Sequence, residues 1–218
     1  MSLLKPIVMD GRFERLAAHG DVIGGAETLA NSTLANANDG VLPASVITSG
    51  FCIRSGPGTP FTDTTDTATD IIGALSTGIG STCASPGDTF RFRYANTVAF
   101  AATIAAGTGV TLGTLPTPDV AASSFKDYIV TLTNTTPVST VSGNTTNAST
   151  VITGMTQAQT AAVSVGMAVT GNGVGVGAVV TSIQTGVGVN VSVASTATAT
   201  NVALTFSPTV RMDAITMP

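Results

Sequence analysis

The sequence has few of the side chains on which enzymes and nucleic-acid-binding proteins rely. It contains no Trp, one His and two Cys among 218 residues, and only 9% of the residues are charged. General acids, general bases and metal ligands come largely from His, Cys and the charged side chains. Phosphate binding depends on clustered Lys and Arg, whereas this chain has eight of them and a net charge of −4. We therefore expect no enzymatic activity, no cofactor and no nucleic-acid partner.

Long apolar runs are also missing, although 43% of the residues are hydrophobic. Runs such as Val98 to Ala106 end well before the roughly 18 residues that a membrane-spanning helix needs. The first ten residues lack the basic and apolar regions of a signal peptide. We expect a soluble protein without a membrane partner. Cys52 and Cys83 are then expected to be reduced and buried, with a disulfide as the less favoured alternative.

Thr, Val, Ala and Gly dominate the composition, which is typical of strands and turns rather than long helices. The predicted fold is all-β: a β-sandwich or jelly-roll-like domain with one short helix, an extended N-terminal arm and a second small β domain. Residues 1–45 are predicted to form the arm, with one or two short strands, and residues 46–139 plus 209–218 the sandwich. Residues 140–208 are predicted to form the second domain. They are either an insertion into the first domain or the second member of a tandem.

An unbroken neutral stretch runs from Tyr128 to Val210. A surface of that size normally carries both signs of charge for solubility, so hydroxyls and amides must solvate this one or neighbouring subunits must cover it. Short β-like runs recur in the stretch at intervals of about twelve residues, as in a compact all-β unit. The predicted strands are Thr150–Ile152, Ala168–Thr170, Ala178–Ile183, Asn190–Val193 and Val202–Phe206.

In the first domain the clearest pattern is the alternation from Phe90 to Tyr94. It places three aromatic rings on one face of a strand and Arg91 and Arg93 on the other. A short amphipathic helix is predicted through Ala68, Ile71, Ile72 and Leu75, with N-cap residues among Thr62 to Asp66. Further strands are predicted at Val46–Arg54, Val98–Ala105, Gly109–Leu112 and Tyr128–Asn134.

Arg91 and Arg93 are candidate contact residues. Two guanidinium groups on one strand face can bind carboxylates of a partner, or they can pair with a nearby Asp on a solvated face. Both alternatives stay open. In the arm, the corresponding candidates are Arg12, Phe13 and Arg15.

Other motifs point to no chemistry. His19 is the only imidazole, and the sequence contains no Gly-x-Ser-x-Gly motif that would supply a serine nucleophile for it. No catalytic residue is therefore expected. Asp63, Asp66 and Asp70 either mark a helix start, which we favour, or form a weak Ca²⁺ site. The Gly-x-Gly-x-x-Ala pattern at 173–178 precedes β-branched residues rather than a helix, so it is interpreted as a turn and not a dinucleotide site.

Several segments resemble virion structural proteins of tailed bacteriophages, notably head decoration (cement) and head-fibre proteins. The segments are Gly87–Asn96, Ala102–Leu112 and Phe125–Asn134, with Val165–Gly171 and Val179–Ile183 similar to β repeats of that class, and Gly11–Asp21 similar to the opening of such chains. The resemblance implies a non-enzymatic protein, made in the host cytoplasm, on the capsid exterior. Its partners would be the major capsid protein and itself, as a homotrimer or homodimer, and it would stabilise the capsid lattice. The alternative is a head or tail fibre or spike subunit, with residues 140–208 as a host-glycan adhesin.

Overall fold

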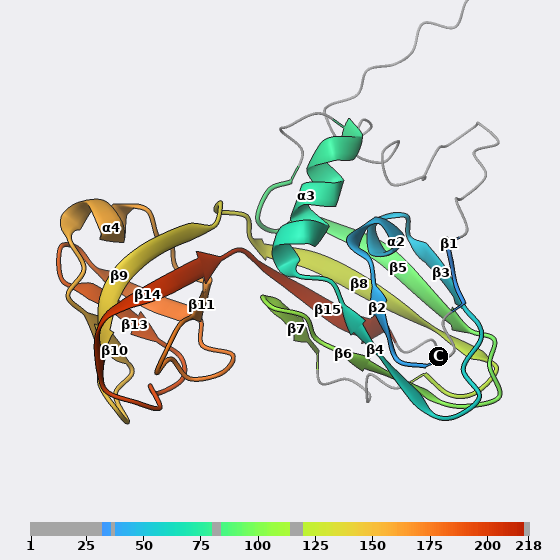
Figure 1. The fold of residues 1–218 in the computed structure, drawn as a ribbon. Helices are drawn as coiled ribbons and strands as arrows, with labels where there is room; N and C mark the ends of the chain where they lie inside the picture. Colours follow the sequence, from blue (N-terminus) through green and yellow to red (C-terminus); the bar gives the residue numbers. More distant parts are fainter. Residues whose placement is uncertain (1–31, 36–37, 80–83, 114–119, 216–218) are drawn as a thin grey trace, which may run out of the picture.

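The computed structural model describes residues 32–35, 38–79, 84–113 and 120–215. Within these residues the chain forms fifteen strands and three helices, so the all-β prediction is confirmed. Figure 1 shows two units side by side, joined by two crossings of the chain. The first unit comprises the described residues up to Asn134 together with the last strand. The second unit comprises residues 139–207.

The first unit contains two sheets. The larger has the order β1 (Ser32–Leu34), β3 (Phe51–Arg54), β5 (Thr89–Asn96), β8 (Ser124–Asn134), β15 (Thr209–Ile215) and β7 (Val110–Leu112). In it β8 runs antiparallel to both β5 and β15, and the other neighbours are parallel. The smaller sheet is parallel and has the order β2 (Gly40–Leu42), β4 (Phe61–Thr65) and β6 (Ala102–Ala105).

One apolar core lies between these two sheets and the helices α2 (Ala44–Thr48) and α3 (Ala68–Ile79). Phe90, Phe92 and Tyr94 all point into it, as their alternation predicted. The ring of Phe92 stacks on that of Tyr128 from the neighbouring strand. Burying a large apolar side chain stabilises a fold by about 1.5–3 kcal/mol, so the aromatic face of β5 anchors the unit. The predicted helix is also present, with Ala68, Ile71 and Leu75 buried.

A buried ion pair crosses the core between the two sheets. Arg54 on β3 donates to both carboxylate oxygens of Asp63 on β4, at 2.8 and 3.1 Å, and both residues are fully buried. Tyr94 on β5 donates its hydroxyl to the same carboxylate at 2.6 Å. The guanidinium also donates to the carbonyl oxygens of Asn38 and Ser55 and lies over the ring of Phe61. Every charge in this cluster therefore has a partner, as burial requires.

The structure corrects three predictions in this region. The run from Val46 to Arg54 is not one strand, because α2 occupies its first half and Gly50, with φ +83°, separates the helix from β3. Apolar runs this short fit a helix and a strand equally well. The helix α3 does not start among Thr62 to Asp66, because these residues lie in β4 or just after it, and Thr67 instead accepts the N–H of Asp70.

The third correction concerns the strand predicted at Val98–Ala105, of which only Ala102–Ala105 is a strand and pairs with β4. The predicted arm, for which one or two short strands were expected, contains two strands of three residues at 32–34 and 40–42. They pair within the two sheets of the first unit.

The second unit is a single six-stranded sheet that closes on itself. Its order is β11 (Ala168–Thr170), β14 (Ala199–Ser207), β9 (Ser139–Thr145), β10 (Val151–Thr153), β13 (Gly188–Val191) and β12 (Val180–Gln184). The two end strands meet because the N–H of Val169 donates to Ala178 and the N–H of Val180 donates to Met167, both at 2.9 Å. A closed sheet leaves no free strand edge between these two.

The interior of the closed sheet is apolar, with Ile152, Met167, Val189, Leu204 and Phe206 fully buried. Five of the six strands fall on or next to predicted runs, and residues 171–177 form a loop without a helix, as the turn interpretation required. Sequence reasoning missed β9 and the short helix α4 (Gln157–Ala161).

Neutral polar side chains join the two units where the chain crosses between them. Asn134, at the end of β8, donates to the Ser164 hydroxyl and to the Val165 carbonyl, each at 2.9 Å. Thr209, at the start of β15, donates to the Gly166 carbonyl at 2.8 Å. Both anchoring residues are buried, so each crossing is fixed to the same loop of the second unit.

We predict that Asp63→Asn lowers the free energy of unfolding by about 3 kcal/mol, because it leaves the Arg54 charge buried without its counter-ion. Tyr94→Phe should cost about 1 kcal/mol, the value of one hydrogen bond. Urea unfolding followed by circular dichroism measures both changes. Thr103→Ala, at an exposed position on β6, is the control. An Asp63→Asn protein as stable as the control would contradict the role of the pair.

We also predict that the two units fold separately. The second unit has its own core, and its first and last strands are paired with Ser139 opposite Phe206. Excised residues 137–208 should therefore unfold cooperatively in urea. The remaining chain, with a Gly-Asn-Gly turn replacing residues 137–208, should do the same, because β8 and β15 are already paired. Loss of cooperative unfolding in both pieces would show that neither core is self-sufficient.

Candidate interaction surface

The outward face of the larger sheet in the first unit carries an unusual share of the charge in this chain. We name it the open face. It consists of the outward side chains Phe51, Ile53, Arg91, Arg93, Phe125, Asp127, Ile129, Arg211, Asp213 and Ile215. Phe125 is 54% exposed and Ile129 is 39% exposed. The face therefore combines large apolar groups with ions of both signs on rigid strands.

Asp127 is the centre of the charge arrangement. Its carboxylate is only 3% exposed and accepts from Arg93 at 2.6 and 2.8 Å and from Arg91 at 3.0 Å. The Arg93 guanidinium also lies over the Phe125 ring, 4.4 Å from its centroid. The hydrogen bonds from Arg93 hold the pKa of Asp127 below its ordinary value, and the positive charges of both Arg residues add to this. The pKa of Arg93 is raised by the same hydrogen bonds.

Arg91 and Arg93 were predicted either to bind carboxylates of a partner or to pair with a nearby Asp. The structure shows that both pair with Asp127. The Arg91 side chain is nevertheless 62% exposed, and within the described residues only its Nη2 atom has a hydrogen bond, to Asp127. Contact with a partner stays a prediction for both residues. Asp127 and Phe125 were missed as site residues, although Tyr128, Val130 and Leu132 alternate inward and so place both on the outward face.

The strand register places an ion on each side of Ile129. Arg91 on β5 is its partner on one side, and Asp213 on β15 is its partner on the other. Asp213 accepts from Arg211 at 2.8 Å, and both side chains of this pair are exposed. The hydrogen bond to Asp213 raises the pKa of Arg211.

Within the described part of the chain, the other candidate residues do not assemble into a site. Arg12, Phe13, Arg15 and His19 lie outside the described residues. The three carboxylates of the Asp63, Asp66 and Asp70 cluster point to different partners: Asp63 binds Arg54 in the core, Asp66 accepts from the N–H groups of Ala44 and Thr67, and Asp70 accepts from the Thr67 hydroxyl. Within the described ranges no group of three acidic, His or Cys residues is placed to hold a metal ion.

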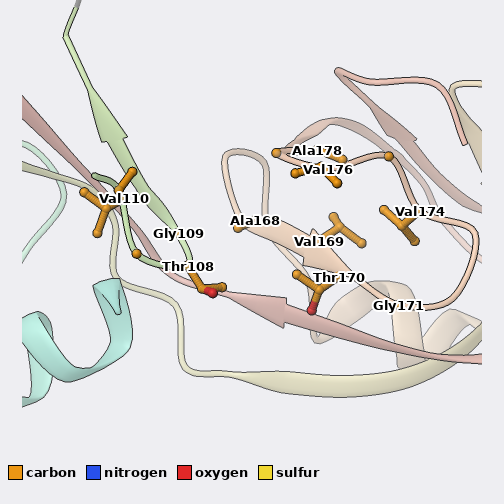
Figure 2. A pocket seen from close by; sticks show the side chains of 14 residues that line it. Thr108, Gly109, Val110, Ala168, Val169, Thr170, Gly171, Val174, Val176 and Ala178 are labelled. Atoms are coloured by element: carbon orange, nitrogen blue, oxygen red, sulfur yellow. The ribbon is translucent and has the colours of Figure 1, made fainter. Parts of the chain in front are cut away.

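A cleft of about 470 Å³ lies between the two units. Figure 2 shows Thr108, Gly109 and Val110 on one side of it and β11 with the loop to Ala178 on the other. Its lining is glycine, alanine and valine with two threonines, and contains no titratable side chain. Val176, which is 97% exposed, also contributes to the lining. The cleft can shield a small apolar group from water, but its side chains supply no acid or base.

Cys52 is a free, buried thiol beside the Arg54 and Asp63 pair. Burial, with a smaller contribution from the Asp63 charge, raises its pKa to about 12. The thiolate is the reactive form of cysteine, and burial disfavours that form at Cys52. Cys83 lies outside the described residues.

Comparisons with known protein families, with curated proteins and with solved structures found no match. The resemblance to phage head proteins therefore stays a prediction. None of the described helices is long and apolar enough to cross a membrane. The open face, with its paired ions and exposed aromatic ring, is the best candidate for function in the described part of the chain.

We predict that Asp127→Asn lowers the free energy of unfolding by about 1 kcal/mol at pH 7. The effect is small because the Arg partners of Asp127 are partly exposed to water. Because the pKa of Asp127 is lowered in the folded state, its ion pairs stabilise the protein above the unfolded pKa near 4. This contribution is lost as the pH falls through the folded-state pKa. Urea unfolding at pH values from 7 to 2 should therefore show the two proteins converging in acid. A gap that widens in acid would contradict the assignment. Thr103→Ala, at an exposed position on β6, is the control and should leave the free energy of unfolding unchanged at each pH.

Proposed function

We propose that this chain is a non-enzymatic structural protein of a tailed-phage particle. In this proposal it is a head decoration (cement) protein that binds the major capsid protein on the outside of the head and stabilises the lattice. The observation that carries the proposal is the second unit, which is folded and closed yet carries no charged residue between residues 139 and 207.

A neutral surface suits packing against fixed neighbours. The second unit exposes hydroxyls, amides and single valines, including Val165, Val176 and Val187. Covering such a surface does not require charges to be removed from water, which is the largest cost of burying polar surface. Exposed apolar groups also favour contact with other proteins. Both features support a role in a static assembly.

The architecture fits the same proposal. We interpret the first unit as a β-sandwich of jelly-roll type and the second unit as a domain inserted between β8 and β15. Support for the insertion comes from β15, which returns to pair with β8 after the second unit is complete. A domain attached by two buried crossings is held in a fixed orientation, as presentation on a particle surface requires.

Capsid binding is assigned in this proposal to the segment of residues 1–31, which lies outside the described residues. Its contact residues are Arg12, Phe13 and Arg15, an aromatic ring between two guanidinium groups. Arg and aromatic side chains carry a large share of binding energy at protein interfaces. A segment that binds only the assembled lattice stabilises that lattice by mass action.

Gold-tagged antibody against this chain, applied to purified virions, tests the location. The proposal predicts label over the whole head. Label confined to a vertex or to the tail would contradict it and favour the fibre or spike alternative, with residues 140–208 as a glycan adhesin. Virions without any label, from a preparation shown by mass spectrometry to lack the chain, would reject both.

We predict that Arg12→Ala, Phe13→Ala and Arg15→Ala together weaken binding to heads at least tenfold, because the triple variant removes the proposed anchor. Co-sedimentation of purified protein with heads that lack it measures the binding. Lys5→Ala, in the same segment, is the control. The triple variant should keep the unfolding midpoint of the parent protein. If the folded triple variant binds heads as tightly as the parent protein, these three residues are not the capsid contact and the prediction is wrong.

A further inference from the structure

The open face is complementary to itself across strand β8. We infer that it joins two copies of this chain face to face. The two-fold axis runs parallel to β8, midway between the larger sheet of one copy and the larger sheet of the other. The inference does not rest on the proposed function, because it concerns the purified chain alone. It assigns the partner contact predicted for Arg91 to a second copy of this chain.

One row of the larger sheet carries an ion on each side of its central strand. Arg91, Ile129 and Asp213 form one row across β5, β8 and β15. A two-fold axis along β8 places β5 of one copy over β15 of the other. Residues of the same row stay at the same position along the strands. Arg91 of each copy then faces Asp213 of the other copy, and the interface contains this pair twice.

The apolar residues of the face fall on the axis itself. Ile129 and Phe125 both lie on β8, so each meets its own copy across the interface. Asp127 also lies on β8, but Arg93 and Arg91 already neutralise its carboxylate. Two apolar residues therefore meet on the axis, one on each side of the neutralised Asp127 along β8. The Arg91 and Asp213 pairs lie to the two sides of the axis, so the apolar contacts are central and these ions peripheral.

The reach and the size of the face both suit such a dimer. Sheets that pack face to face lie about 10 Å apart, a gap that an Arg and an Asp side chain span together. An axis along β8 makes five strands, from β3 to β7, overlap between the two copies. At a strand spacing of about 4.8 Å and a rise of about 3.3 Å per residue, the overlap has a footprint of roughly 25 by 25 Å. Specific interfaces bury about 800 Å² per partner, and an uneven face with this footprint offers a comparable accessible area.

A partner of another kind fits the pattern less well. The face carries three Arg and two Asp residues, so neither a purely acidic nor a purely basic partner surface would pair with all of them. Arg91 keeps donor atoms without a hydrogen bond among the described residues, and Asp213 lies at the same level on the opposite side. A second copy supplies both opposite charges at the matching positions.

Light scattering on the purified full-length chain across a concentration series tests the inference. The parent protein should be a dimer. Arg91→Glu and Asp213→Arg should each raise the dimer dissociation constant at least tenfold, because each places like charges across the interface. The double variant restores opposite charges and should recover dimerisation. Ile129→Lys, at the centre, should give a monomer, and Thr103→Arg on β6 should stay dimeric.

Circular dichroism and urea unfolding must show that each single variant is folded. If a charge variant does not fold, Ile129→Lys provides an independent test of the same interface. A monomeric parent protein would overturn the inference, as would single charge variants that dimerise like the parent. A double variant that stays as monomeric as the single variants would also overturn it. A monomer that still labels whole heads would refute the dimer while leaving the proposed function intact.

Discussion

The buried pair of Arg54 and Asp63 is the interaction on which the geometry of the first unit depends. It connects the two sheets, and Tyr94 brings a third strand to the same carboxylate. Two charges removed from water are tolerated only in a geometry that satisfies them fully. The pair therefore joins the two sheets at one point in the core, and the open face lies on the far side of the larger sheet.

Charge and neutrality are divided between the two units. In the described residues every Asp, Arg and Lys lies in the first unit, whereas the second unit is stabilised by an apolar core inside a closed sheet. The junction uses amides and hydroxyls, with Asn134 and Thr209 buried against one loop. These polar groups fix the orientation of the second unit without bringing charge to its surface.

Alternation and composition predicted much of this fold. The inward faces of β5 and β8 were readable because large rings or branched residues recur at every second position, and the neutral stretch from Tyr128 to Val210 marked the second unit. The strand β9 was not readable, because one of its inward positions is Gly143, where a Cβ would lie 2.6 Å from Leu204. Nor was the pairing of Arg54 with Asp63, since it depends on how two sheets meet. The role of Asp127 required the register between β5 and β8, which no local pattern reveals.

We propose that this chain is a paired, two-unit protein on the outer surface of a phage head. A cryo-electron microscopy reconstruction of the particle that carries this chain tests it most directly. The account predicts density on the outer surface of the head in which two copies meet through their larger sheets and each second unit stands apart from that contact. Single copies would contradict the pairing, and density confined to the tail would contradict the location.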